Sequence, residues 1–324
     1  MTLVAIDAIG VGSSTSHVHE DDYLGEYNNL ISLASAELEG TFAALASPTF
    51  SKQETVTNLH SKVCAQVRTG NKPSFPWSSL LEFIPRLALA FFNLLYASLR
   101  FRVKQIPANS IYFRTCLVPR SFQGDALVDD YFRSLPDDLA YDNKVIVSFQ
   151  PMNYSLLKKI KKLRRKDNYI VGVGLLGVFD IFALFIDYIV GACVQVRGCY
   201  RYGSLDITPA INQSLLTDYF RLRSFQAYQE KHICLKLRNF NLKAFIYVFE
   251  NQSWEKVCCS ILKTPCTRLV SYQSSGFSKV FLNFFPTAMD AKIHPMPDVI
   301  LTVGELFTRH LLNHGNFAIP VKTF

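Results

Sequence analysis

Charged residues are scarce in this sequence, at 19% of its 324 residues, and it contains no internal repeat and no low-complexity tract. Apolar residues account for 49% and aromatic residues for 13%, so the chain can bury enough surface to offset the entropy lost on ordering. This composition excludes an intrinsically disordered protein and a small module held together by disulfides or a metal. At roughly 150 residues per domain, the length predicts about two domains or one large α/β unit.

Motifs for several common chemistries are also missing. The eight cysteines are scattered and form no Cys-x-x-Cys pair, which excludes a zinc ribbon and a dithiol redox motif. There is no P-loop and no Gly-x-Ser-x-Gly nucleophile elbow. Residues 172–177 match Gly-x-Gly-x-x-Gly, but residues 190–200 contain none of the acidic side chains that a dinucleotide site needs there. We therefore expect neither a cofactor nor a bound metal.

The N-terminus has no basic segment followed by a long apolar one, so it predicts no signal peptide, and we expect a cytoplasmic protein. Two apolar stretches bear on membrane association. Residues 87–99 are shorter than the roughly 20 residues of a spanning helix. Residues 170–194 are long enough, but Asp180 and Asp187 would each cost on the order of 3 kcal/mol at a bilayer centre. We interpret both stretches as buried helices of a soluble protein.

Positive charge is in moderate excess, with 34 Lys and Arg against 26 Asp and Glu, which favours anionic partners. Seven of the nine residues from Lys158 to Lys166 are basic, within a helical pattern over 153–166. We expect this helix to contact an anionic membrane surface or a lipid phosphate; the alternative is a solvated face of a helix lying on the sheet. The cations expected to make the contact are Lys158, Lys159, Lys161, Lys162, Arg164 and Arg165. The run lacks interleaved aromatics and a helix-turn-helix signature, so we expect no nucleic acid partner.

A recurring strand-then-helix pattern runs along the chain. Runs rich in β-branched or aromatic residues predict strands at 3–6, 110–118, 144–149, 169–173, 244–249, 268–272 and 299–303. Helical patterns lie at about 77–105, 126–139, 153–166, 177–200, 209–237, 253–263 and 304–314. The alternation predicts an α/β fold, a Rossmann-like parallel sheet with right-handed crossovers and helices on both faces. We expect a weakly specified segment at 1–70 and one Rossmann-like domain at 71–324, with a helical insertion at about 77–105.

In such a sheet, ligands bind at the carboxyl ends of the strands. Glu250 directly follows the predicted strand 244–249, where its carboxylate could take a proton from a sugar hydroxyl as a general base. The competing interpretation is a Glu that caps the next helix. Trp254 is either a platform for stacking a sugar or a core anchor. The residues expected to line the same rim and bind substrate are Gln252, Trp254, Glu255, Gln273, Ser274 and Gly304.

Four segments together carry a family resemblance: residues 129–139, 250–256, 270–275 and 296–304. In this order, they resemble bacterial surface-carbohydrate (lipopolysaccharide or capsule) biosynthesis proteins of the GT-B glycosyltransferase type. The resemblance covers roughly residues 75–324. It implies transfer of a sugar from a nucleotide-sugar donor to a lipid-linked or saccharide acceptor, with Glu250 as the base.

The resemblance also carries two departures. Such proteins tend to have a histidine after the Tyr-Gln pair, whereas Ser274 follows Gln273 here. A GT-B enzyme has a second Rossmann-like domain that binds the nucleotide-sugar, and we expect that C-terminal donor domain to be absent. The part present would be the acceptor-side half, inactive alone, which the basic helix and the apolar helix at 77–105 would bring to the inner membrane as a peripheral protein. The alternative is a non-catalytic α/β binding or scaffolding subunit at the membrane surface.

Overall fold

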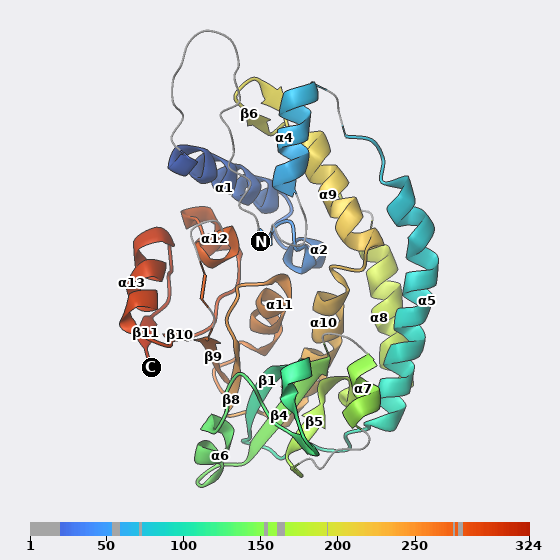
Figure 1. The fold of residues 1–324 in the computed structure, drawn as a ribbon, viewed down its shortest axis with the longest axis vertical. Helices are drawn as coiled ribbons and strands as arrows, with labels where there is room; N and C mark the ends of the chain where they lie inside the picture. The colour runs from blue at the N-terminus through green and yellow to red at the C-terminus, as the bar shows by residue number, and fades with distance from the viewer. Residues whose placement is uncertain are drawn as a thin grey trace.

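The computed structural model describes residues 20–53, 59–70, 73–151, 155–160, 166–192, 194–274, 276–277 and 281–324 (Figure 1). Its centre is a seven-stranded sheet in which every neighbouring pair is parallel. The strands are β1 (Ile111–Leu117), β4 (Val145–Pro151), β5 (Tyr169–Val171), β8 (Ala244–Val248), β9 (Arg268–Gln273), β10 (Val299–Thr302) and β11 (Val321–Thr323). Six of them confirm predicted strands. The edge strand β11 was not predicted, and the predicted strand at 3–6 lies outside the described residues.

The strand order is β11-β10-β9-β8-β1-β4-β5. The chain therefore starts in the middle of the sheet, moves outward from β1 to β5, and returns to the other side of β1 to continue from β8 to β11. This doubly wound order is consistent with the predicted Rossmann-like fold, and its direction reverses between β1 and β8. In register, Ile111 of β1 lies between Val145 and Ala244.

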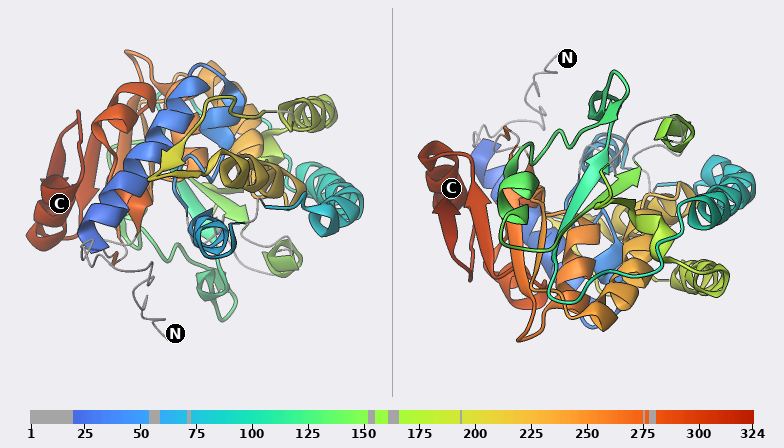
Figure 2. Two further views of the ribbon diagram at one scale, coloured as in Figure 1. Left: turned by 90° about the horizontal axis from the view of Figure 1, so that it is seen from above. Right: turned by 90° about the horizontal axis from the view of Figure 1, so that it is seen from below.

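Helices cover both faces of this sheet, which explains why β1 is buried at nearly every position instead of alternating. The crossovers place α6 and α7 on one face and α10 and α11 on the other (Figure 2). The α-helices of the described residues are α1 (Glu20–Glu37), α2 (Phe42–Ala46), α4 (Leu59–Thr69), α5 (Trp77–Arg100), α6 (Leu135–Ala140), α7 (Ser155–Ile160), α8 (Val178–Gly191), α9 (Thr208–Phe220), α10 (Phe225–Leu237), α11 (Ser253–Leu262), α12 (Ala288–Ile293) and α13 (Glu305–His314).

The helix predicted at 126–139 was wrong over most of its length. Residues 126–127 form a short hairpin with residues 122–123, and the helix α6 begins only at Leu135. The carboxylate of Asp129 accepts hydrogen bonds from the backbone N–H groups of Tyr131 and Phe132 and from the hydroxyl of Thr115. This local turn competes with helix formation and fixes the segment against β1.

Two further predicted helices differ from the structure: one is shorter than predicted, and the other is divided into two. The helix predicted at 177–200 stops at Gly191, and the following chain is held by Asn212, whose side-chain amide exchanges hydrogen bonds with backbone Val196. The single helix predicted at 209–237 is two helices, α9 and α10, because Leu222 adopts a left-handed conformation with φ 57°. The chain direction therefore changes between these helices.

The described part of residues 1–70, the segment expected to be weakly specified, contains the helices α1, α2 and α4. Tyr27, Ile31, Leu59 and Val63 form a second apolar core with Ile211 of α9. Much of the buried face of α1 consists of small residues, with Ser32, Ala34 and Ser35 all inside. Such a face gives little hydrophobic periodicity, which explains why the sequence pattern did not reveal the helix.

A buried carboxylate attaches this N-terminal layer to α9. Asp218 is fully buried and accepts hydrogen bonds from the backbone N–H (3.1 Å) and the hydroxyl (2.6 Å) of Thr49. Burial raises the pKa of Asp218 to about 6, although the bonds from Thr49 lower it in part. The folded protein therefore holds this proton more tightly than the unfolded chain between about pH 4 and pH 6.

The stability of the wild-type protein relative to Asp218→Asn should consequently fall as the pH rises. We expect the difference in free energy of unfolding to decrease by about 3 kcal/mol between about pH 4 and pH 7, because each pKa unit is worth about 1.36 kcal/mol. Urea unfolding at several pH values measures this difference. Asp125→Asn, at an exposed turn, is the control and should show a flat difference. A flat difference for Asp218→Asn as well would contradict the prediction.

The two apolar stretches interpreted as buried helices are exposed over much of their surface, which corrects that interpretation. They form α5 and α8, which pack side by side along one edge of the molecule (Figure 1). Among the described residues, α5 alone is long and apolar enough to cross a bilayer by length and composition, and 11% of its most apolar stretch is buried.

Candidate functional site

The reversal of strand order between β1 and β8 marks the sheet edge where Glu250 lies. Glu250 lies two residues after the end of β8 at Val248, and its side chain remains partly exposed. Two amide side chains brace this turn: Asn283 donates to the backbone carbonyl of Glu250 (2.6 Å), and Asn251 donates to the carbonyl of Asn283 (2.7 Å). Asn251 itself has a left-handed φ of 49°. The turn is therefore held in one conformation by contacts with the segment after β9.

Glu255, predicted to bind substrate, caps the helix that follows. Both of its carboxylate oxygens accept hydrogen bonds from backbone N–H groups, those of Glu250, Asn251 and Gln252, each at 3.0 Å. The side chain is buried, and this burial raises its pKa to about 8. Glu255 caps α11, so the capping role that was the alternative interpretation of Glu250 belongs to Glu255.

Two successive hydrogen bonds between side chains orient the carboxyl group of Glu250. The side-chain N–H of Gln252 donates to Glu250, and the carbonyl oxygen of Gln252 accepts from the indole N–H of Trp254 at 2.9 Å. Trp254 is buried against Tyr247, which favours the interpretation as a core anchor over that of a platform for stacking a sugar. Gln252 consequently uses both ends of its amide to connect Glu250 to the protein core.

Behind Trp254 lies an arginine that sequence reasoning missed. The guanidinium of Arg114, in β1, stands 3.5 Å from the centre of the Trp254 ring. It forms two hydrogen bonds, of 3.1 and 2.9 Å, to one carboxylate oxygen of Glu230 in α10. Both side chains are fully buried, and a charged residue in the middle of an otherwise apolar strand is the signal that could have indicated this pair.

Burial and the charge of Arg114 together set the acidity of Glu250. Burial raises the pKa of Glu250 above its ordinary value, and the positive charge of Arg114 lowers it in part. The pKa of Tyr131 rises to about 12, first through burial and then through the nearby Cys116 and Glu250. Cys116 and Tyr131 therefore face the same region as Glu250, and they are further candidate site residues that the sequence pattern did not suggest.

The parallel sheet places the ends of β9 and β10 along the same edge as Glu250, as predicted. Gln273, however, is fully buried at the end of β9 and lies inside the protein, not on the predicted rim. Ser274 and Gly304 are partly exposed, and Gly304 has open space around its Cα where a ligand could approach. Of the residues predicted to bind substrate, these two and Gln252 remain accessible in part.

The basic helix is described only over Ser155–Ile160. Lys158 and Lys159 are exposed there, while Leu156 and Ile160 are buried against the body of the protein. The predicted contacts at Lys161, Lys162, Arg164 and Arg165 lie outside the described residues.

Among the described residues, one group of side chains could supply three metal ligands: Glu230, Cys234 and Cys258, whose ligand atoms lie within 4.8 Å of one another. The site does not fit a metal ion well. The carboxylate of Glu230 is already paired with Arg114, and burial raises the pKa of the Cys258 thiol well above its ordinary value, which disfavours the thiolate. This group is better explained as part of the buried network behind Trp254.

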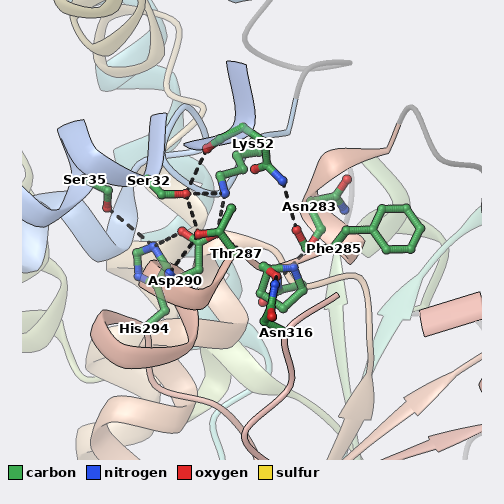
Figure 3. A network of polar contacts seen from close by, with 12 residues as sticks. Ser32, Ser35, Lys52, Asn283, Phe285, Thr287, Asp290, His294 and Asn316 are labelled. Carbon is green, nitrogen blue, oxygen red and sulfur yellow. Dashed lines mark hydrogen bonds and ion pairs between the residues drawn. The ribbon is translucent and has the colours of Figure 1, made fainter. Parts of the chain in front are cut away.

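A second buried polar cluster lies between α1, α11 and α12 (Figure 3). Lys52 forms an ion pair with Asp290 and donates a hydrogen bond of 2.7 Å to Ser32. Lys256 is also buried near Asp290, and its pKa is lowered to about 8 by burial. The nearby His294 contacts Ser35 of α1 at 3.4 Å. One carboxylate thus compensates two buried lysines, and its pKa is lowered to about 2 by them despite burial.

Sequence reasoning missed this cluster because Lys52 and Asp290 are 238 positions apart.

The chain matches no protein-family model, no curated protein and no solved structure. Its function must therefore be inferred from the arrangement around Glu250 and from the motifs in its sequence.

Proposed function

We propose that this chain is the acceptor-side domain of a glycosyltransferase-like protein of surface polysaccharide assembly, in which Glu250 acts as the general base. The observation that carries the proposal is the position of Glu250. It lies where the strand order reverses, and Glu255, not Glu250, caps the following helix. The contact from Gln252 holds its carboxyl group in place. The sugar chemistry itself comes from the resemblance of residues 129–139, 250–256, 270–275 and 296–304 to GT-B proteins.

In the proposed reaction, the carboxylate of Glu250 accepts the proton of an acceptor hydroxyl. The hydroxyl oxygen forms a bond to the anomeric carbon of the donor sugar, and the bond from that carbon to the nucleotide phosphate breaks. The nucleotide leaves with the electron pair. A raised pKa suits Glu250 to this task, because a base is most effective when its pKa lies near the working pH.

Replacing Glu250 with glutamine tests the proposal. We expect the kcat for sugar transfer by the full-length protein to fall at least about 100-fold, since general-base catalysis contributes about 10²- to 10⁴-fold. Transfer of a labelled sugar from a nucleotide-sugar to a lipid-linked or saccharide acceptor measures this. The matched control is Glu305→Gln, an exposed glutamate that follows β10, which should change kcat by less than about twofold. Undiminished transfer in Glu250→Gln would refute the base assignment.

A second candidate function, a non-catalytic binding or scaffolding subunit, is favoured by the burial of Trp254 and Gln273. Their burial leaves fewer side chains on the rim to contact a reacting sugar. In this case the wild-type protein would bind a saccharide or lipid-linked acceptor without transferring any sugar, and Glu250→Gln would leave that binding unchanged. Isothermal titration of the acceptor, run beside the transfer assay, separates the two candidates.

A further inference from the structure

The helices α5 and α8 form an antiparallel pair on one flank of the protein. Phe83 near the start of α5 contacts Tyr188 near the end of α8, and Phe91 further along α5 contacts Phe182 near the start of α8. Figure 2 shows α7, α5 and α8 next to one another along this flank. The outward sides of α5 and α8, here called the α5–α8 face, are not covered by any described part of the chain.

The charges of α8 point away from this face. Asp180 pairs with Lys236 at 2.9 Å, and Asp187 pairs with Lys231 at 2.6 Å, so both carboxylates face α10. Every residue that α8 exposes is apolar, and all of Val178–Gly191 is described. The exposed residues are Val178, Phe179, Phe182, Ala183, Ile186, Ile189 and Val190. A helix on a water-exposed surface normally turns its charged and polar residues to solvent and its apolar residues to the core.

The exposed side of α5 continues this apolar surface. Its large exposed side chains recur at helical spacing along the whole helix: Trp77, Leu81, Ile84, Leu89, Phe92, Tyr96 and Leu99. Glu82 and Arg86 are also exposed, but they form an ion pair with each other and neutralise their charges. The α5–α8 face therefore gathers large exposed apolar side chains from both helices, as interaction surfaces do.

Both ends of α5 are attached to the folded body. At the start, Gln213 of α9 donates to the carbonyl of Ser74 (2.5 Å), and Arg221 donates to Ser79 (3.1 Å). At the end, the backbone N–H of Val103 donates to the carbonyl of Gly174 (2.9 Å). The helix thus lies flat along the protein, so a bilayer can meet its side but cannot be crossed by it without unfolding these contacts.

Cations lie at both ends of this apolar face. Beside Trp77, a cavity of about 350 Å³ is lined by Lys62, Arg221 and Arg223. At the other end, Arg102 and Lys104 line a second cavity, of about 420 Å³. The exposed Lys158 and Lys159 belong to α7, next to α5 in both views of Figure 2. Phosphate groups of anionic lipids complement such a border of positive charge.

We infer that the α5–α8 face docks in the plane of a bilayer that contains anionic lipids. Its apolar side chains enter the boundary between headgroups and acyl chains, and the cations at both ends contact lipid phosphates. Trp77 lies at the edge of the face, where tryptophan is favoured at a membrane interface. A second copy of the chain fits this surface poorly, because both ends of α5 are basic and like charges would meet in either orientation. The inference does not depend on the role of Glu250.

Flotation of the full chain with vesicles tests the docking. We expect binding to vesicles that contain about one third phosphatidylglycerol, and at least tenfold weaker binding to phosphatidylcholine alone. Phe179→Ser/Ile186→Ser should weaken binding at least tenfold. The matched control, Leu306→Ser/Leu312→Ser, removes two exposed apolar side chains from α13 and should bind like the wild type. Arg102→Gln/Lys104→Gln should weaken binding to the anionic vesicles only.

The two tryptophans provide a second measurement. Trp77 is 66% exposed and Trp254 is 4% exposed, so a change of surroundings on the α5–α8 face affects Trp77 selectively. We expect a blue shift of the emission on adding anionic vesicles and quenching by brominated acyl chains, both lost in Trp77→Ser. The inference would be overturned if the folded wild type does not float with anionic vesicles. It would also be overturned if sedimentation shows a dimer whose formation, and not vesicle binding, is lost in Phe179→Ser/Ile186→Ser.

Discussion

Asp290→Asn is expected to lower the free energy of unfolding by about 3 to 5 kcal/mol. Asp290 is the buried carboxylate beside Lys52 and Lys256; burial lowers the pKa of both lysines, and the negative charge of Asp290 opposes that shift. Asparagine keeps the shape of the side chain but removes the charge, which leaves two buried ammonium groups without compensation. Removing one partner of a buried ion pair is costly for this reason, whereas the pair as a whole adds little stability.

Chemical denaturation in urea measures this loss. Asp298→Asn is the control, because Asp298 is partly exposed and lies 3.8 Å from Lys263; it should cost less than about 1 kcal/mol. The pH dependence adds a second criterion. Burial lowers the pKa of Lys256 to about 8 in the wild type, and removing the charge of Asp290 lowers it further, so the variant loses this proton at a lower pH. The part of the cost that comes from Lys256 should therefore shrink as the pH rises to about 8 and stay constant above it. A loss below about 1 kcal/mol at neutral pH would contradict the compensation of the lysines by Asp290.

Glu230→Gln is expected to have a similar effect in the core behind the candidate site, again about 3 to 5 kcal/mol. The variant leaves the guanidinium of Arg114 buried without its hydrogen-bonded carboxylate partner. Replacing both partners, in Arg114→Met/Glu230→Leu, should recover most of this loss, because apolar residues of similar volume need no compensating charge. A double-mutant cycle in urea compares the two single variants with the double variant, and a double variant as unstable as the sum of the singles would contradict the argument.

The same pair connects stability to the proposed chemistry. Arg114 lowers the pKa of Glu250, so Arg114→Met should raise that pKa further. The acidic limb of the pH profile for kcat/KM should then move to higher pH, because Glu250 accepts a proton only when ionised. A purely structural role of Arg114 would reduce activity without moving the limb. This comparison distinguishes a positioning residue from one that only supports the fold.

The sheet and the location of Glu250 could be predicted from the sequence because both depend on local patterns. Buried parallel strands are short runs of β-branched and aromatic residues, and six such runs were recognised between Ser110 and Val303. A residue that directly follows a parallel strand must lie at the carboxyl edge of the sheet, whatever the details of packing. Glu250 was therefore placed correctly without any knowledge of its neighbours.

The partners of Glu250 could not be predicted in this way. Glu255 and Glu250 are both acidic residues at the start of one helix, and only the three-dimensional turn decides which of them receives the backbone N–H groups. Likewise, Trp254 becomes a core anchor because Arg114, 140 positions earlier, lies against its ring. Contacts of this range leave no periodic pattern in the sequence.

The exposure of α5 and α8 likewise separates what local sequence patterns determine from what tertiary contacts decide. The sequence by itself determined that both segments are apolar helices and that strands alternate with helices, because helical and strand periodicities are properties of neighbouring residues. Only the tertiary structure decided which side of each helix faces outward. Asp180 and Asp187 form ion pairs with lysines of α10, so the charged side of α8 faces α10. The side that faces away from the protein is apolar.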